Sequence, residues 1–307
     1  MATTSLRSSM GVPLLASRGY RAVEQLRGGS YGTLYVVQDM NAHISSPPRH
    51  AAAASSNNGF KGCQLPSGEA TGVLAAKVLP RTRHDLPQYV NMDMIRSEIK
   101  GLERVRGACP NVLQLHGVVE DDDHVCLLTD LLLPGGAAPK PEGAATVGLH
   151  CLAVDLVRGV AACHAAGLMH GDIKPDNVVL DCEGGRGWVL IDFGSSVECT
   201  GHTEGVYRLR LLTPRYAAPE VLRYRPGTDV GFAADMYSIG ATLIELRERR
   251  PPAIAREPMR VTVLDWAIDE MLHRRPESRP TAQQVLQWLL ESDPVREARD
   301  KPAALEV

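Results

Sequence analysis

The sequence lacks several patterns that would assign it to a protein class at once. It has no apolar run long enough to span a bilayer, which takes about 20 residues. The seven cysteines are odd in number and scattered, with no C-x-x-C pair, which argues against a disulfide framework and fits a reducing compartment. The ten histidines show no H-E-x-x-H or other ligand spacing. We therefore expect no structural metal held by cysteine or histidine.

An excess of charge of one sign is also lacking. The formal net charge of -3 is small for 307 residues, so neither a nucleic acid nor an anionic membrane is indicated as a partner. Hydrophobic residues make up 44%, which is ordinary for a globular protein with a core. We expect a monomer in the cytoplasm, with the nucleus open as an alternative.

The chain divides into a strand-rich part and a helix-rich part. Short β-prone runs such as GTLYVVQDM and HVCLLTDLLL dominate residues 20–133, whereas residues 134–290 carry mostly helical patterns. Residues 41–72 are rich in Ser, Pro, Ala, Asn and Gly and predict a low-complexity insertion between two strands. This order predicts an α+β fold with a small β-rich lobe, a larger helical lobe and a cleft between them.

Both ends of the chain are predicted to lie outside this folded unit of residues 20–290. Residues 1–19 hold two arginines, several Ser and Thr and no acidic residue. That composition is typical of a flexible leader, and an organellar transit peptide is a less favoured alternative. Residues 291–307 are expected to form a C-terminal tail.

One stretch places three polar groups close together just before an expected strand. HGDIKPDNVVL, residues 170–180, holds Asp172, Lys174 and Asn177 at steps of two and three. A carboxylate in a turn can accept the proton of a hydroxyl, an amine can neutralise a phosphate oxygen, and a carboxamide oxygen can bind a divalent metal. Asp192 adds a second carboxylate fifteen residues after Asn177. The set indicates phosphoryl transfer, which depends mostly on positioning and charge neutralisation.

A series of motifs resembles eukaryotic-type protein kinases over roughly residues 20–290. RGGSYGTL resembles the glycine-rich loop over ATP phosphates, LAAK the strand with the phosphate-binding lysine, and HGDIKPDN the catalytic loop. DFG resembles the metal-binding motif, AAPE the end of the activation segment, and DMYSIG the buried helix that anchors the catalytic loop. Each motif alone is weak, but their shared order is specific. The resemblance implies a two-lobed kinase fold, ATP, Mg²⁺ and protein substrates.

The resemblance also implies a role for each matching catalytic residue. Lys77 would bind the α- and β-phosphates of ATP, and Glu98, on a helix, would orient Lys77. Asp172 would orient the substrate hydroxyl and take its proton. Lys174 would stabilise charge on the γ-phosphate.

Further residues would bind the metal and the nucleotide. Asn177 and Asp192 would bind Mg²⁺. The residues that would contact ATP besides Lys77 are Leu26, Gly28, Gly29, Gly32, Leu34, Ala75, Thr129, Asp130, Leu132 and Val179. Two structural expectations also follow from the resemblance: a core stack of Leu102, His170 and Phe193, and an ion pair between Glu220 and Arg279.

The hydroxyl that accepts the phosphate is also indicated. Lys174, two residues after Asp172, resembles the serine/threonine type of kinase rather than the tyrosine type. TPRYAAPE, which begins at Thr213, resembles the same type. The resemblance therefore implies an ATP-dependent serine/threonine kinase.

Two positions depart from the family pattern. Arg27 lies where the first glycine of the G-x-G-x-x-G loop is expected, although Gly28 follows it and could replace that glycine by a one-residue shift. Gly171 lies where many such kinases have an arginine that binds a phosphate on the activation loop. We therefore expect activity that does not depend on phosphorylation of this loop. Its candidate acceptors are Ser195, Ser196, Thr200, Thr203, Tyr207 and Thr213.

Two other interpretations stay open. Small-molecule phosphotransferases for aminoglycosides or choline resemble kinases and often carry H-G-D followed by Asn, which fits Gly171 but not Lys174 or the A-P-E segment. A pseudokinase scaffold would bind nucleotide without catalysis. The presence of Lys77, Asp172 and Asp192 argues against the scaffold, because such a chain would be free to lose them.

Overall fold

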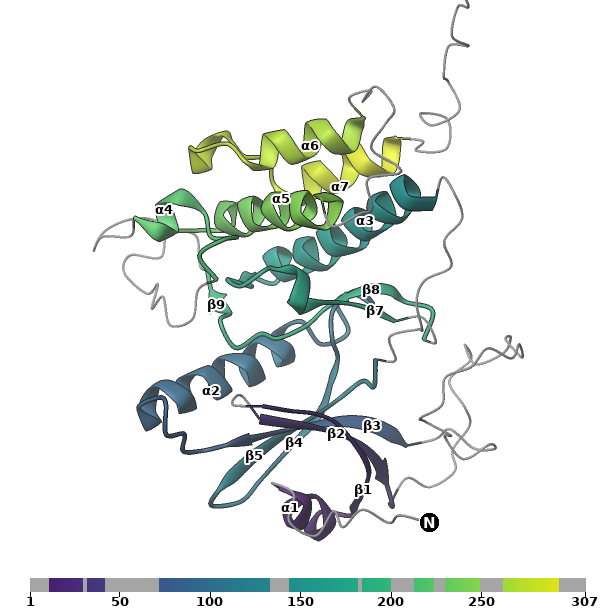
Figure 1. The fold of residues 1–307 in the computed structure, drawn as a ribbon, viewed down its shortest axis with the longest axis vertical. Coiled ribbons are helices and arrows are strands. Elements are labelled where there is room, and N and C mark those ends of the chain that lie inside the picture. Colours follow the sequence, from purple (N-terminus) through teal and green to yellow (C-terminus); the bar gives the residue numbers. More distant parts are fainter. Residues whose placement is uncertain are drawn as a thin grey trace, which may run out of the picture.

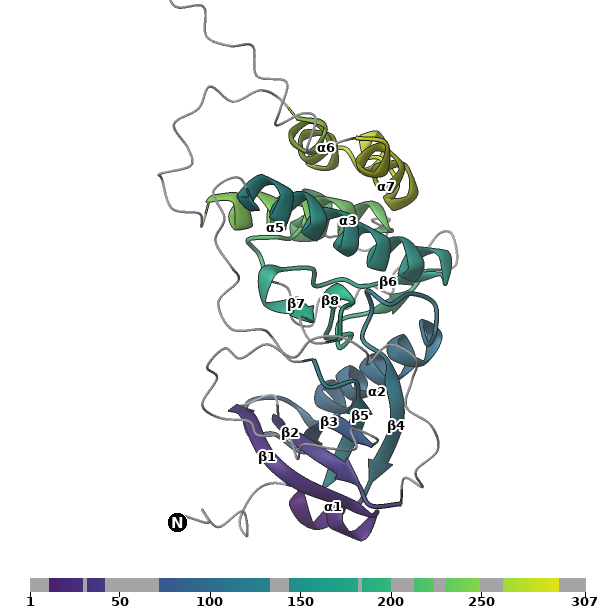
Figure 2. The same cartoon turned by 90° about the vertical axis from the view of Figure 1, so that its right-hand side faces the viewer.

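The computed structural model describes residues 11–29, 32–41, 72–132, 144–181, 184–199, 213–223, 230–248 and 262–292. A five-stranded antiparallel sheet forms the smaller lobe, and helices form most of the larger one (Figures 1 and 2). The predicted α+β fold with two lobes is confirmed. The predicted C-terminal tail from residue 293 on, and the predicted insertion apart from its two end residues, lie outside the described residues.

The sheet of the smaller lobe contains five strands in the order β1-β2-β3-β5-β4. Their bounds are β1 (Tyr20–Gly29), β2 (Gly32–Asp39), β3 (Val73–Pro80), β4 (Leu115–Glu120) and β5 (His124–Thr129). α2 (Gln88–Arg104) packs on one face, where Ile95 and Leu102 join a core with Leu127 of β5. Ile95, Ile99 and Leu102 recur at steps of four and three, which is why this segment forms an amphipathic helix.

A short helix covers the opposite face of the sheet. α1 (Val12–Ser17) buries Leu14 and Leu15, which are 3% and 0% exposed, in a cluster with Tyr35 and Val37 of β2. The flexible leader predicted for residues 1–19 is therefore wrong for α1. Six residues make fewer than two helical turns, too few for a periodicity to appear in the sequence. Residues 1–10 lie outside the described residues.

The packing of α1 can be tested through Leu15. We expect Leu15→Ala to lower the free energy of unfolding by about 2–5 kcal/mol, because it removes buried methyl groups and leaves a cavity against the sheet. Urea unfolding followed by circular dichroism would measure this. Leu290→Ala is the matched control: Leu290 is 58% exposed, so its loss should cost about 0.5 kcal/mol or less. Equal stability of the two variants would contradict the packing of α1.

The larger lobe is built mainly from α3 (Ala144–Ala165), α5 (Ala233–Glu248), α6 (Val263–Met271) and α7 (Ala282–Glu291). α6 and α7 each begin with a capping box, Thr262 with Asp265 and Thr281 with Gln284, which fixes where these helices start. The short α4 (Pro219–Leu222) precedes α5. Among the residues that the structure describes, no helix has both the length and the apolar character needed to cross a membrane.

The larger lobe also contains two small two-stranded sheets. β6 (Leu168–Met169) pairs with β9 (Val197–Glu198), and β7 (Val178–Asp181) pairs with β8 (Gly187–Leu190). β7 and β8 lie on the side of the larger lobe that faces the smaller one (Figure 1). The HGDIKPDN stretch joins β6 to β7, so the fold places it between the two lobes.

Candidate functional site

The polar residues of the HGDIKPDN stretch converge on one carboxylate. The Lys174 Nζ lies 2.5 Å from Asp172 Oδ2, and the Thr213 hydroxyl donates to Asp172 Oδ1 at 3.0 Å. The Asn177 amide donates to the backbone carbonyl of Asp172 at 2.8 Å. A 3-10 turn over Pro175–Asn177 brings the amide back to Asp172. Both carboxylate oxygens are therefore fixed in direction.

Asp235 of α5 fixes the backbone of the same stretch. Its carboxylate accepts from the backbone N–H groups of His170 and Gly171 at 2.8 and 2.9 Å, and from His164 Nε2 at 2.9 Å. Burial would raise the pKa of Asp235, but His164 and these backbone donors keep it below its usual range. Gly171 has φ +80°, a conformation that favours glycine over residues with a side chain. The local backbone therefore accounts for glycine at this position.

Lys77 of β3 and Glu98 of α2 form the predicted pair. Lys77 Nζ lies 2.6 Å from Glu98 Oε1 and 3.6 Å from Asp192 Oδ1. Burial alone would lower the pKa of Lys77, but these two carboxylates raise it above its usual range. Lys77 therefore stays a cation, and it connects the sheet to α2 and to the segment after β8.

Asp192 and Asn177 provide two oxygen ligands of the kind that Mg²⁺ prefers. The side chain of Asp192 is 44% exposed, and Lys77 keeps the pKa of this carboxyl below its usual range although burial acts in the opposite direction. The nitrogen of the Asn177 amide faces Asp172, so its oxygen points elsewhere. Within the described ranges no group of three or more His, Cys, Asp or Glu side chains could bind a metal ion by itself. The donor set fits a metal that takes its other ligands from a bound substrate.

The expected core stack beside Asp192 is present. Leu102, His170 and Phe193 are each 0% exposed, and the rings of His170 and Phe193 meet edge to face with centroids 4.9 Å apart. The expected ion pair of Glu220 with Arg279 is confirmed as a bidentate contact, with N–O distances of 2.6 and 2.8 Å. This pair joins α4 to the segment before α7.

The residues predicted to contact the nucleotide lie on neighbouring strands. Leu34 pairs with Lys77 across β2 and β3, and Ala75 pairs with Thr129 across β3 and β5. Ala75 and Thr129 are buried, whereas Leu26 of β1 is 40% exposed. Val179 lies on β7, and Leu132 follows β5. Whether these side chains contact a nucleotide stays a prediction.

The glycine-rich segment forms the hairpin of β1 and β2. Gly28 pairs with Thr33, Gly29 pairs with Gly32, and residues 30 and 31 at the tip lie outside the described residues. Gly32 has φ +134°, and a Cβ there would lie 2.5 Å from the Val78 carbonyl oxygen. Glycine is therefore required at this position.

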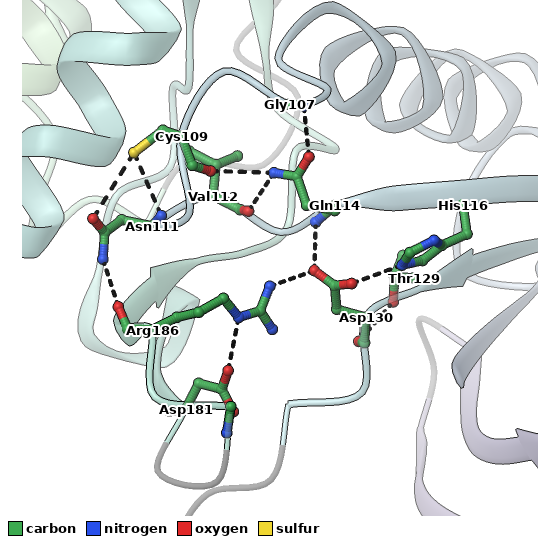
Figure 3. Close-up of polar contacts among 11 residues, drawn as sticks. Gly107, Cys109, Asn111, Val112, Gln114, His116, Thr129, Asp130, Asp181 and Arg186 are labelled. Carbon is green, nitrogen blue, oxygen red and sulfur yellow. Dashed lines mark hydrogen bonds and ion pairs between the residues drawn. The ribbon is translucent and has the colours of Figure 1, made fainter. Parts of the chain in front are cut away.

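The side chain of Asp130 faces protein groups rather than an open site (Figure 3). Its carboxylate accepts from the Gln114 N–H at 3.3 Å, contacts His116 Nε2 at 2.7 Å, and forms an ion pair with Arg186. Burial would raise the pKa of Asp130, but His116 and Arg186 keep it below its usual range. Its backbone N–H donates to the Gln114 carbonyl at 3.2 Å. Its carbonyl accepts from the Thr129 hydroxyl at 3.3 Å and keeps a second lone pair, with which it could contact a nucleotide.

Arg186 connects Asp130 to the larger lobe. Its Nε lies 2.7 Å from Oδ2 of Asp181, which is 2% exposed, while its terminal nitrogen pairs with Asp130. We call Asp130, Arg186 and Asp181 the hinge clamp. Asn111, before β4, donates to the carbonyl of Arg186 at 3.0 Å (Figure 3). It also donates to the carbonyl of Trp188 at 2.9 Å. The turn between β7 and β8 is thus bonded to the smaller lobe by side chains of Arg186 and Asn111.

Comparison with known proteins gives concordant matches. Residues 64–296 match the family model described as "Protein kinase domain". "Calcium-dependent protein kinase 12" of Oryza sativa subsp. japonica is 30% identical over 254 residues, which cover 72% of this chain and 44% of that protein. "Ribosomal protein S6 kinase 2 alpha" of Gallus gallus is 27% identical over 333 residues, which cover 94% of this chain and 42% of that protein.

A third relative matches a shorter part of the chain. "CBL-interacting protein kinase 4" of Oryza sativa subsp. japonica is 36% identical over 159 residues, which cover 48% of this chain and 33% of that protein. The chain therefore spans less than half the length of each of these three relatives.

Proposed function

Because this chain belongs to the protein kinase family, we propose that it transfers the γ-phosphate of ATP to serine or threonine hydroxyls of protein substrates. The arrangement around Asp172 carries the proposal. Its carboxylate lies 2.5 Å from the ammonium of Lys174 and accepts from Thr213 at 3.0 Å. A base and a cation placed side by side suit transfer of a phosphoryl group to a hydroxyl.

Each of these residues has a separate role in the proposed reaction. Asp172 accepts a hydrogen bond from the substrate hydroxyl, which points its oxygen at the phosphate, and then takes the proton. Lys174 lies next to Asp172 and faces the negative charge that develops on the transferred group. Lys77, kept cationic by Glu98 and Asp192, binds oxygens of the phosphates that stay behind.

Mg²⁺ fits between Asn177 and Asp192 by the chemistry of their donors. When bound there it would neutralise phosphate charge. Asp192 contributes an ionised carboxylate, since Lys77 lowers its pKa. Asn177 contributes its amide oxygen, oriented by the hydrogen bond from its nitrogen to Asp172.

The test of the proposed function is phosphate transfer from labelled ATP in the presence of Mg²⁺. The purified chain is incubated with a library of Ser, Thr and Tyr peptides, and the labelled amino acid is identified. Label on Ser or Thr supports the proposal. Label only on Tyr, or transfer only to added aminoglycoside or choline, would replace it with another phosphotransferase. Binding of ATP without transfer to any acceptor would favour a scaffold.

We further propose that activity does not require phosphorylation of the activation loop. Gly171 offers no side chain to bind a loop phosphate. Of the candidate acceptors, Ser195 is half-buried, Ser196 is 6% exposed and donates to the Ser97 carbonyl, and Thr213 contacts Asp172. Thr200, Thr203 and Tyr207 lie outside the described residues.

Replacement of Ser195 and of these last three acceptors tests the proposal. We expect Ser195→Ala, Thr200→Ala, Thr203→Ala and Tyr207→Phe together to leave kcat/KM within about threefold, a change of ~0.7 kcal/mol. Peptide phosphorylation kinetics would measure it. Thr213→Ala is the contrasting variant, since loss of its hydroxyl frees Asp172 and Lys174 and should lower kcat. Loss of activity in the quadruple variant, with an unchanged melting temperature, would show that loop phosphorylation is required.

We propose that the protein acts as a monomer in the cytoplasm, with protein substrates as its partners and neither nucleic acid nor membrane. The modest net charge supports this proposal.

A further inference from the structure

Arg104, the last residue of α2, binds two parts of the larger lobe. Its Nε donates to the carbonyl of Ala166, in the turn between α3 and β6. Its Nη1 lies 3.2 Å from Oε2 of Glu198 on β9. β9 pairs with β6, which leads into the HGDIKPDN stretch. Arg104 therefore connects the end of α2 to the segment after Asp192 and to the chain just before the catalytic loop.

This contact is the second of two that join the same parts of the chain. Glu98 lies six residues before Arg104 on α2, and Asp192 lies six residues before Glu198. Glu98 Oε1 and Asp192 Oδ1 both contact Lys77 Nζ, at 2.6 and 3.6 Å. α2 and the segment that begins at Asp192 are therefore joined at both ends, by Lys77 at one end and by the ion pair of Arg104 with Glu198 at the other.

Between these two ends the segment packs closely on α2. Ser196 Oγ donates to the Ser97 carbonyl at 3.2 Å, and Phe193 is fully buried. A Cβ on Gly101 would lie 2.5 Å from Ser196 Oγ and 3.1 Å from Phe193 Cβ, so glycine is required for this approach. Because the segment lies against the backbone of the helix, α2 cannot shift without breaking these contacts.

Asp192 needs this support because its backbone is strained. It has φ +65°, and within the described part of the chain it is the only non-glycine residue whose φ is positive. A strained conformation persists when the surrounding structure holds it. Gly171 offers no side chain to bind a loop phosphate, so contacts within the folded chain must provide that hold.

We infer that Arg104 is a positioning residue for the Asp192 carboxylate. Through Glu198 it holds the segment after Asp192 on α2, and so it keeps Asp192 in the conformation that can bind Mg²⁺ without a phosphate on the activation loop. This inference rests on the proposed function and gives a physical basis for its independence from loop phosphorylation.

Hydrogen exchange of the protein without ATP or metal tests the positioning directly. The Cys199 N–H donates to the Gly167 carbonyl at 2.8 Å, so exchange in residues 193–199 reports whether the segment stays in place. We expect Arg104→Ala to raise the exchange rates there by about tenfold, which is ~1.4 kcal/mol. Exchange in the sheet of the smaller lobe should stay unchanged.

Steady-state kinetics relate this positioning to catalysis. We expect Arg104→Ala to lower kcat by about tenfold and to raise the Mg²⁺ concentration for half-maximal rate, because Asp192 leaves its conformation. KM for a Ser peptide should stay within about twofold, since the change affects the metal carboxylate rather than peptide binding. The side chains of Arg104 and Glu198 are 38% and 52% exposed, and ion pairs so exposed add little to stability. The melting temperature should therefore change little.

Matched variants separate the ion pair from the loss of an arginine. Arg106 is exposed two residues after Arg104, so Arg106→Ala should behave like the wild type. Glu198→Gln removes the charge of the other partner and should show a weaker form of the Arg104→Ala effect. The double variant should lose no more than Arg104→Ala alone, because both changes remove one interaction. If Arg104→Ala melts at a much lower temperature, Glu198→Gln alone takes its place in both measurements.

The outcomes distinguish failure of this inference from failure of the proposed function. Arg104→Ala with the exchange rates and kcat of the wild type, or with faster exchange and an unchanged kcat, overturns the positioning role and leaves the proposed function intact. Effects of Arg104→Ala and Glu198→Gln that simply add also overturn it, because the two residues would then act independently. A wild type that binds ATP but phosphorylates no peptide overturns the proposed function and this inference with it.

Discussion

Asp172→Asn should lower kcat for peptide phosphorylation by about 10³-fold, within the range that a general base contributes. Asparagine has the same shape, and its one amide oxygen can keep the contact with either Thr213 or Lys174, so the loop should keep most of its geometry. It cannot take the proton of the substrate hydroxyl. Because Asp172 does not contact the expected phosphate-binding pair of Lys77 and Glu98, nucleotide affinity should stay nearly unchanged. Steady-state kinetics and calorimetric titration with ATP would measure the two effects separately.

A neighbouring carboxylate provides the control for this variant. Asp176 is exposed and lies in the 3-10 turn that follows Asp172 in the same stretch, so Asp176→Asn removes an equal charge four residues away. We expect it to keep most of the activity. If Asp172→Asn retained more than a tenth of the wild-type kcat, or if Asp176→Asn lost as much, Asp172 would not be the base.

Lys77→Met should have the second largest effect, lowering kcat/KM by about 10²–10³-fold, the size seen when one preorganised donor is removed. Two consequences of the substitution act together. The phosphates lose a cation, and Glu98 loses its partner. Burial already raises the pKa of Glu98, and loss of the Lys77 cation should raise it further. ATP binding and peptide kinetics would quantify the loss.

Lys100→Met controls for the loss of a lysine, because Lys100 is exposed on α2. Glu98→Gln separates the two consequences: it keeps Lys77 but removes the carboxylate that orients it. We expect Glu98→Gln to lose less activity than Lys77→Met. An equal loss in both variants would mean that the pair acts as a unit, and full activity in Lys77→Met would exclude it from phosphate binding.

Local motifs explain which parts of the site were predictable. Asp172, Lys174 and Asn177 lie within six residues, so the sequence alone places them together. Lys77 and Glu98 are twenty-one residues apart in the sequence. Their contact was predictable because the resemblance to protein kinases pairs a lysine on a strand with a glutamate on the next helix. The division into lobes was predictable because the spacing of hydrophobic residues changes from a strand pattern to a helix pattern along the chain. Such a change can be recognised over long segments.

Other features depend on contacts that no local pattern records. Asp130 and Arg186 are 56 residues apart, and neither belongs to a motif that names the other. The sequence offered only a weak signal, the opposite charges of Asp181 and Arg186 on either side of a Gly-Gly turn. The ion pair of Arg215 with Glu245 was not predicted either, because the sequence pattern of α5 indicates only a buried helix. Such pairs become visible only once the chain is folded.

The hinge clamp also affects the order in which the chain can complete its fold during synthesis. The ribosome adds β5 and Asp130 more than fifty residues before Arg186. Until β8 exists, Asn111, which is 1% exposed in the finished structure, lacks the carbonyls of Arg186 and Trp188 to which it donates. A buried polar group without a partner costs free energy. We therefore expect the smaller lobe to reach its final packing only after residue 190 has emerged, so that the two lobes mature together rather than in succession.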